Sequence, residues 1–270
     1  MPFATRAAHL LATASVAVAL ALSGGGCSNI GSRDTTGSIS NAGPAQASQA
    51  EWRSSLDTLG DRYRANPNDA DVAMAYAQAL RATDQRAQAV AVLEQASIRN
   101  PRSMQVVGAY GRALADAGQY RQALEALGRA HTPDNPDWRI LNVQGAVLDQ
   151  MGRHADAQRL YATALKIVPD EPSVLSNLGL SYLLTKDLKN AETTLRRAVA
   201  QPNAGPKVRQ NLALAVGLQG RFEDAEKIAR ADLPEDEAAA NVNYLRQMLA
   251  QHRDLKKLGR AYTPTTDAGS

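Results

Sequence analysis

The chain has 270 residues, and aromatic side chains make up only 4% of them. Closely packed, Ala-rich helices account for such a composition better than a core built around large rings. Lys and Arg outnumber Asp and Glu by 30 to 27, and these charges are dispersed along the sequence. Because nucleic-acid binding requires a clustered basic patch, we expect no nucleic-acid partner.

The first residues have the pattern of an export signal. Arg6 precedes an apolar run from Leu10 to Leu22, within a segment that we assign as a signal peptide over residues 1–26. The run is shorter than the roughly 20 residues of a membrane-spanning helix, so it is typical of a signal-peptide core. The segment ends in LSGGGC, Leu22 to Cys27, which resembles the lipobox of bacterial lipoproteins.

That resemblance implies that Cys27 becomes the first mature residue and carries acyl chains. Ser28 after it implies sorting to the outer membrane, with the protein facing the periplasm. The alternative is cleavage after Ser23 by the ordinary signal peptidase, which would leave a soluble periplasmic protein. Cys27 is the single cysteine, so no internal disulfide and no thiolate metal cluster can form. Residues 27–50 are rich in Ser, Gly, Ala and Thr and predict a flexible tether.

Beyond Glu51, apolar residues recur at helical spacing and no stretch alternates with period two for long enough to indicate a strand. The sequence falls into 34-residue frames that start at Ala70, Met104, Trp138, Pro172 and Pro206. Ala or Gly fills fourteen of the fifteen eighth, twentieth and twenty-seventh places, the exception being Asp232. This pattern resembles the tetratricopeptide repeat (TPR) family. The resemblance implies an all-α tetratricopeptide-repeat superhelix, an α-solenoid, of about five helix-turn-helix repeats with helical caps.

The small sites predict where the two helices of a repeat approach most closely. A large side chain at such a site would force the helices apart, at a cost of about 1 to 3 kcal/mol. Ala157 and Ala164 lie seven residues apart and share a helix face with Tyr161 between them. We therefore expect these two alanines to be structural.

The repeats are expected to occupy residues 70–239, and a stack of repeats needs a cap at each end. Residues 51–69 predict an N-terminal capping half-repeat, residues 240–260 predict a C-terminal capping helix, and residues 261–270 predict a disordered tail. In the closing segment the side chains expected to pack inward are Val242, Leu245, Met248 and Leu249.

No residue pattern predicts catalysis, a metal site, a cofactor or a small-molecule substrate. His131 and His154 have no partner at the spacing of metal ligands or of a catalytic triad, and we expect both to be solvated. The signal, tether, repeats and caps leave no segment of the chain for an enzyme domain. The rival class, an enzyme or its regulatory arm, lacks a candidate catalytic residue.

The first helices of the repeats are expected to line a concave groove that binds an extended or helical segment of a protein partner. The polar, N-terminal part of this groove is predicted to contain Arg81, Arg112, Arg139, Asn142 and Asp149. The apolar, C-terminal part is predicted to contain Leu180, Leu183, Leu184, Leu214 and Leu218. Asn177 and Asn211 are placed to hydrogen-bond a bound backbone. The alternative for the leucines is that they only seal neighbouring repeats.

The stretch from Leu175 to Leu249 resembles the TadD lipoproteins of tight-adherence (Tad, or Flp) pilus systems. The phrases VRQNLALAVGLQGRFEDAE and NVNYLRQML carry most of the likeness. It implies a noncatalytic outer-membrane lipoprotein that helps to assemble or localise the pilus secretin, or that holds a segment of another assembly component in its groove. The other candidate is a general periplasmic or outer-membrane TPR adaptor for outer-membrane assembly or for cell-wall enzymes.

Overall fold

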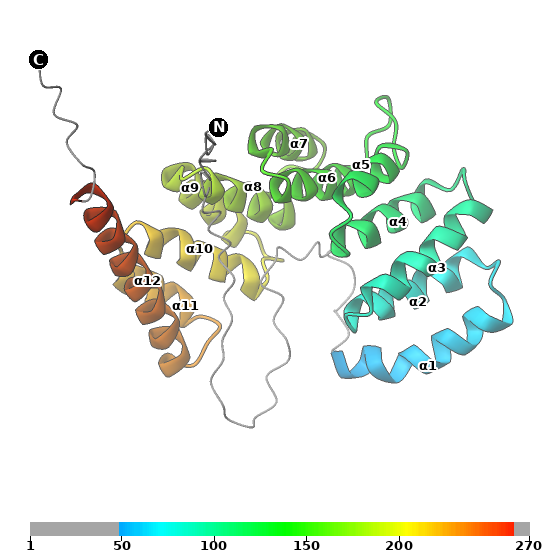
Figure 1. The fold of residues 1–270 in the computed structure, drawn as a ribbon, viewed down its shortest axis with the longest axis horizontal. Coiled ribbons are helices and arrows are strands. Elements are labelled where there is room, and N and C mark those ends of the chain that lie inside the picture. Colours follow the sequence, from blue (N-terminus) through cyan, green and yellow to red (C-terminus); the bar gives the residue numbers. More distant parts are fainter. Residues whose placement is uncertain (1–48, 262–270) are drawn as a thin grey trace, which may run out of the picture. The chain divides into compact units, whose positions relative to one another are not determined.

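The computed structural model describes the backbone of residues 49–261 and the side chains of residues 51–251. Within that range the chain forms twelve α-helices (Figure 1) and one isolated bridge between Thr132 and Asn135, with no strand. The predicted signal peptide, the proposed lipidation site Cys27, nearly all of the tether and the predicted tail lie outside the described residues. None of the described helices combines the length and the apolar character needed to cross a bilayer.

Ten helices form five helix-turn-helix pairs that follow the 34-residue frames. The first helix of each pair starts at the first residue of its frame: α2 Ala70–Ala82, α4 Met104–Asp116, α6 Trp138–Gln150, α8 Pro172–Leu184 and α10 Pro206–Leu218. The second helices are α3 Arg86–Arg99, α5 Tyr120–Gly128, α7 His154–Ile167, α9 Leu188–Val199 and α11 Phe222–Ala229. This arrangement confirms the predicted all-α solenoid.

The residue before each of the first four frames caps the first helix of that frame with its side chain. Asp69 Oδ1 accepts hydrogen bonds from two backbone amides in the first turn of α2, both at 3.0 Å. Ser103, Asp137 and Glu171 cap α4, α6 and α8 through their side chains in the same way. Such caps stabilise a helix start by about 1 kcal/mol each. The 34-residue period is therefore visible in the capping residues as well as in the small residues.

The turns within the helix pairs share a residue in the left-handed conformation. These residues, with φ between 63° and 85°, are Asp84, Gly118, Gly152, Lys186 and Gly220. Glycine adopts this conformation without steric cost, whereas a side chain such as that of Lys186 makes it less favourable by about 1 kcal/mol. The chain therefore reverses at the same place in every repeat.

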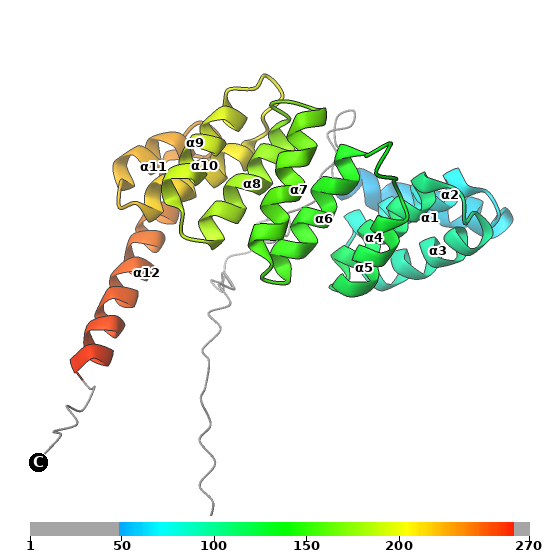
Figure 2. The ribbon, with the colours of Figure 1, turned by 90° about the horizontal axis from the view of Figure 1, so that it is seen from above.

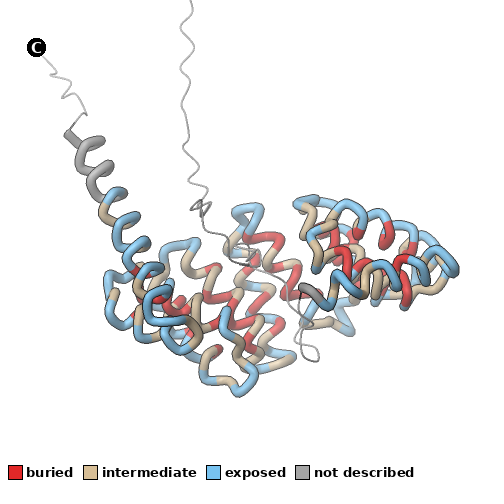
Figure 3. Tube along the Cα trace, turned by 90° about the horizontal axis from the view of Figure 1, so that it is seen from below, coloured by how far each residue is buried: buried red, intermediate tan, exposed pale blue. Residues whose placement is uncertain are grey.

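The core lies between the helices of each pair, where Figure 3 shows the buried residues in red. In α7, Ala157 and Ala164 are 0% exposed and Tyr161 is 1% exposed, which confirms the structural role of the two alanines. A Cβ atom on Gly145 of α6 would lie 2.5 Å from Cε1 of Tyr161. The eighth place is thus small because it receives the large side chain of the twenty-fourth place.

Asp232, the exception among the small sites, follows a second helix that ends early. Because α11 ends at Ala229, the twenty-seventh place of the last repeat lies outside the helix pair. The Asp232 side chain is 8% exposed and pairs with Arg209 of α10, with Nε donating to Oδ2 at 2.7 Å. A charged residue fits here because it has its own counterion.

The N-terminal cap is helix α1, Gln49–Ala65, which begins two residues before the predicted half-repeat. Leu56 and Tyr63 pack against the core of the first repeat. The Tyr63 ring stacks on Tyr76 of α2 with a centroid separation of 5.6 Å. Helix α1 thus covers the apolar face that the first repeat leaves open.

The C-terminal cap is helix α12, Glu235–Ala261, which contacts α10 and α11. Val242 is buried and Leu245 approaches Gly217 of α10. Met248, expected to pack inward, is instead 41% exposed. The physical reason is that the later part of α12 extends past the two helices that it covers (Figure 2).

Candidate functional site: the inner face of the solenoid

The first helices of the five repeats form one continuous face of the stack. The backbone of each of them approaches the first helix of the next repeat, whereas within the described residues the backbones of second helices of different repeats stay farther apart. In a curved stack, the row whose members approach one another lies on the inner side. We call this row of α2, α4, α6, α8 and α10 the inner face.

Two amide hydrogen bonds join neighbouring helices of the inner face. Asn177 Nδ2 donates to Oδ1 of Asn142 at 2.9 Å, and Asn211 Nδ2 donates to Oγ of Ser176 at 2.9 Å. Asn142 is only 5% exposed, so its side chain serves the contact between α6 and α8. The capture of a bound backbone by Asn177 and Asn211 stays a prediction, since one donor of each amide is already engaged.

Asp149, at the end of α6, is buried and does not contribute to the polar surface expected there. Its carboxylate accepts hydrogen bonds from the Tyr161 hydroxyl at 3.0 Å and from the Ser181 hydroxyl at 2.8 Å. His154 Nδ1 lies 2.8 Å from Oδ1 of the same carboxylate, so His154 is not the solvated residue that we expected. Burial and the Asp149 charge raise the pKa of the Tyr161 phenol. This cluster links α6, α7 and α8.

The leucines of the inner face divide into two groups. Leu184 and Leu214 are 55% and 38% exposed. Leu183 packs against the core shared by the last two repeats, and Leu180 and Leu218 are half-buried. Sealing of neighbouring repeats therefore accounts for Leu183, while Leu184 and Leu214 are free to contact a partner.

The three arginines of the inner face have different surroundings. Arg81 Nε donates to Oδ2 of Asp116 at 2.5 Å. The exposed guanidinium of Arg139 lies over the Trp138 ring, 4.5 Å from its centroid. Arg112 is half-buried, and burial, together with the positive charge of Arg81, lowers its pKa to about 10.

A cavity of about 500 Å³ opens beside Arg112, between the starts of α4 and α6 and the connection 129–137. We call it the arginine cavity and define it by Met104, Gly108, Arg112, His131, Trp138 and Arg139. His131 is half-buried, contrary to expectation, and its Nδ1 atom is buried with no hydrogen-bond partner. Sequence reasoning missed this cavity, although Pro133 and Pro136 in the connection were a usable signal.

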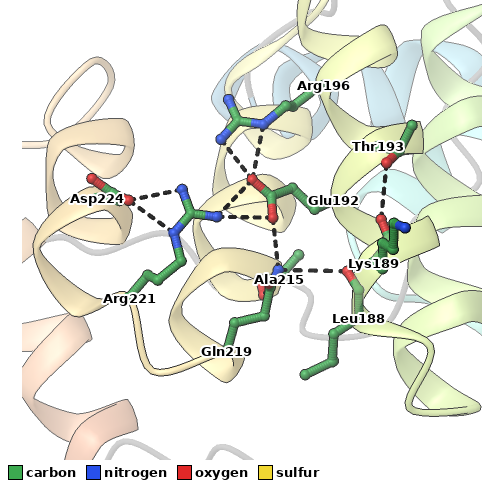
Figure 4. A network of polar contacts seen from close by, with 9 residues as sticks. All are labelled: Leu188, Lys189, Glu192, Thr193, Arg196, Ala215, Gln219, Arg221 and Asp224. Carbon is green, nitrogen blue, oxygen red and sulfur yellow. Dashed lines mark hydrogen bonds and ion pairs between the residues drawn. The ribbon is translucent and has the colours of Figure 1, made fainter.

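Glu192 of α9 forms a polar network at the other end of the stack, which Figure 4 shows. It accepts hydrogen bonds from Gln219 Nε2 at 2.8 Å, from Arg221 Nη1 at 2.9 Å and from Arg196 Nη2 at 2.6 Å. Although desolvation raises the pKa of Glu192, these three hydrogen bonds outweigh it and lower the pKa to about 2. The network ties α9 to the turn between α10 and α11. Among the described residues, no three His, Cys, Asp or Glu side chains converge as a metal site would require.

Two protein-family models match the chain. One, described as anaphase-promoting complex, cyclosome, subunit 3, matches residues 58–130, and the other, described as tetratricopeptide repeat, matches residues 143–206. No curated protein matches the sequence at a significant level. With helix pairs that recur every 34 residues, these matches define an α-solenoid built for protein interaction. The chain has the fold of a tetratricopeptide-repeat superhelix.

Solved structures share this fold at low sequence identity. The Cut9–Hcn1 hetero-tetramer of the APC/C is 16% identical, with a TM-score of 0.62 over 76% of this chain, which spans 40% of that chain. PilW, described as a widely conserved type IV pilus biogenesis factor, is 16% identical, with a TM-score of 0.61 and coverage of 72% and 91% of the two chains. PilF of Pseudomonas aeruginosa is 16% identical, with a TM-score of 0.53 and coverage of 67% and 82%.

These likenesses establish the fold. TPR domains bind protein partners and typically act as noncatalytic scaffolds. The inner face is where such a scaffold presents side chains from several repeats to one extended segment.

Proposed function

We propose that this protein is a noncatalytic scaffold of the bacterial cell envelope whose inner face holds a segment of a pilus-assembly protein, in the first place the secretin of a Tad-type pilus. The observation that carries the proposal is the row of first helices, which presents Leu184 and Leu214 at one end and the arginine cavity at the other. The likeness of Leu175 to Leu249 to TadD lipoproteins supports the pilus assignment, as does the shared fold of PilW.

We further propose that acyl chains on Cys27 attach the protein to the outer membrane and that residues 27–50 tether the solenoid in the periplasm. Replacing the cysteine in Cys27→Ser should move the protein from the membrane fraction to the soluble periplasmic fraction. Radiolabelled palmitate should label only the natural protein. A natural protein that is already soluble and unlabelled would instead support cleavage after Ser23.

The groove is tested with Leu184→Glu combined with Leu214→Glu. Because both leucines are exposed, we expect circular dichroism to be unchanged and capture of the purified secretin to weaken about tenfold or more. A matched control carries the same two charges on second helices, as Ile98→Glu with Ile167→Glu, at side chains that are 65% and 42% exposed. Equal loss of capture in both double variants would contradict a binding role for the inner face.

The cellular role is tested by deleting the gene. We expect fewer pili and fewer secretin multimers, both restored by the natural protein but not by the Leu184 and Leu214 double variant. Normal pili and normal multimers would contradict the pilus assignment. In that case, crosslinked partners from outer-membrane assembly or cell-wall synthesis would favour the general adaptor.

A further inference from the structure

Arg112 differs from the other partly buried arginines of the described chain. Four arginines there are only partly exposed, and three of them, Arg81, Arg86 and Arg209, pair with an Asp carboxylate. Arg112 makes no hydrogen bond or ion pair with any described residue. A guanidinium withdrawn from water without an anion is unfavourable, and its neighbours usually supply one.

The two carboxylates near Arg112 are engaged elsewhere. Asp116 accepts a hydrogen bond from Arg81 at 2.5 Å, and Asp137 caps α6 by accepting from the backbone amide of Arg139 at 2.7 Å. Both negative charges favour the protonated form of Arg112, yet burial outweighs them and its pKa is lowered. Among the described residues, the positive charge of Arg112 is therefore left without a carboxylate in direct ion-pair contact.

The rest of the arginine cavity combines the Arg139 guanidinium with apolar surface. Arg139 is exposed above Trp138 and has no carboxylate partner within the described residues. His131 Nδ1 also lacks a hydrogen-bond partner. Met104 is 46% exposed, and Gly108 leaves room because it has no side chain. Asp137 also lines the cavity, but its carboxylate caps α6, and Arg112 and Arg139 together outweigh its charge. The lining thus suits an anionic group that lies next to an apolar one.

We propose that the arginine cavity binds the acidic side chains of an internal segment of the partner protein, with carboxylates on Arg112 and Arg139 and an adjacent apolar side chain against Met104 and Trp138. This inference rests on the proposed protein-binding function and names the chemistry of the bound segment. Arg112 belongs to α4 and Arg139 to α6, so several acidic side chains along a segment fit better than one terminal carboxylate. Asp116 and Asp137 interrupt the basic track that a nucleic-acid backbone would need.

The test uses the purified soluble chain without its signal peptide and four short fluorescent probes of equal length. The first is a capped peptide of alternating Glu and Leu, and the second replaces each Glu by Gln. The third is the Gln peptide with a free carboxyl terminus, and the fourth is a single-stranded RNA. We expect the Glu peptide to bind at least about tenfold more tightly than each of the other three, and its affinity to fall as salt is added.

Arg112→Met tests the role of the arginine itself. Removing the unpaired charge should weaken binding of the Glu peptide about tenfold or more while leaving the melting temperature unchanged or higher. The control Arg121→Met removes an exposed charge from α5 in the same repeat and should leave both quantities unchanged. A purely structural Arg112 would give the opposite result, with a lower melting temperature and unchanged binding.

The inference is overturned if the Gln, free-carboxyl or RNA probe binds as tightly as the Glu peptide, or if Arg112→Met binds it as the natural protein does. Capture of the secretin that depends on Leu184 and Leu214 would then still support the proposed function. If instead secretin capture does not depend on Leu184 and Leu214 while the Glu peptide still binds, the proposed function is contradicted and the inference about the arginine cavity still holds.

Discussion

Two junctions between neighbouring repeats differ although the same 34-residue period builds both. At the closed junction, where α6 and α7 meet α8, the buried Asp149 carboxylate and the Asn142–Asn177 hydrogen bond join the helices. At the open junction, where α4 and α5 meet α6, contacts are less extensive and the arginine cavity opens beside them. The comparison shows that the polar side chains of a repeat can either hydrogen-bond to the next repeat or remain available to a ligand.

The length of the second helix accounts for much of this difference. Helix α5 has 9 residues, whereas α7 has 14. The segment after Gly128 contains Pro133 and Pro136, which cannot donate backbone hydrogen bonds to a continuing helix. The missing last turn leaves the connection 129–137 to cover the next repeat, and the cavity lies beside it.

The largest effect is expected from Asp149→Ala at the closed junction. The change leaves the buried Tyr161 and Ser181 hydroxyls without an acceptor, so we expect a loss of about 3 kcal/mol in the free energy of unfolding. Urea unfolding followed by circular dichroism measures it. The control Asp156→Ala removes surface ion pairs and should cost about 1 kcal/mol or less. Equal losses would mean that the buried cluster does not hold the junction.

A smaller difference in stability is expected between alanine substitutions at two glycines of the inner face. Gly145→Ala would put a Cβ atom 2.5 Å from the buried Tyr161 ring, and we expect a loss of about 1 to 3 kcal/mol. Gly108→Ala at the open junction meets Cδ1 of Ile140 at 2.8 Å, which is the movable end of a side chain. The better helix propensity of Ala should offset that contact, so we expect the free energy of unfolding to change by less than about 1 kcal/mol. Similar melting temperatures for the two variants would show that the junctions are equally packed.

The smallest effect concerns pH and the Glu192 network, which joins the last two repeats. The pKa of Glu192 is about 2 in the folded protein and about 4.3 in the unfolded chain. The ionised carboxylate therefore stabilises the fold above the unfolded pKa, and this stabilisation is lost as the pH falls toward 2. After allowance for solvent screening, we expect roughly 1 kcal/mol. Hydrogen exchange measured at neutral and at acidic pH should show that α9 and α10 of the natural protein lose protection in acid. In Glu192→Gln the same helices should already be less protected at neutral pH. A pH response unchanged by that variant would assign the stabilisation to other carboxylates.

The sequence made the repeat architecture predictable because the small residues recur at fixed places. The frame starts at Ala70 and Met104 coincide with the starts of α2 and α4, and the buried role of Ala157 follows from helical spacing alone. These features depend on contacts within one repeat, and each repeat supplies the same contact again.

The contacts between repeats were less predictable. Asp149 has the position of a groove residue in the helical projection, yet its hydrogen bonds to Tyr161 and Ser181 come from two other helices. His154 and Asn177 are engaged by partners that only the folded chain brings near. Periodicity indicates which way a side chain points, whereas burial depends on the particular residues opposite.

The contact pattern of the helix rows has a mechanical consequence. First helices contact one another across repeats, and each second helix also contacts the first helix of the next repeat, so a repeat cannot move against its neighbour without disturbing that packing. A segment bound along the inner face would contact several first helices at once and would add to this coupling between repeats. We therefore expect a bound segment to make the solenoid more rigid.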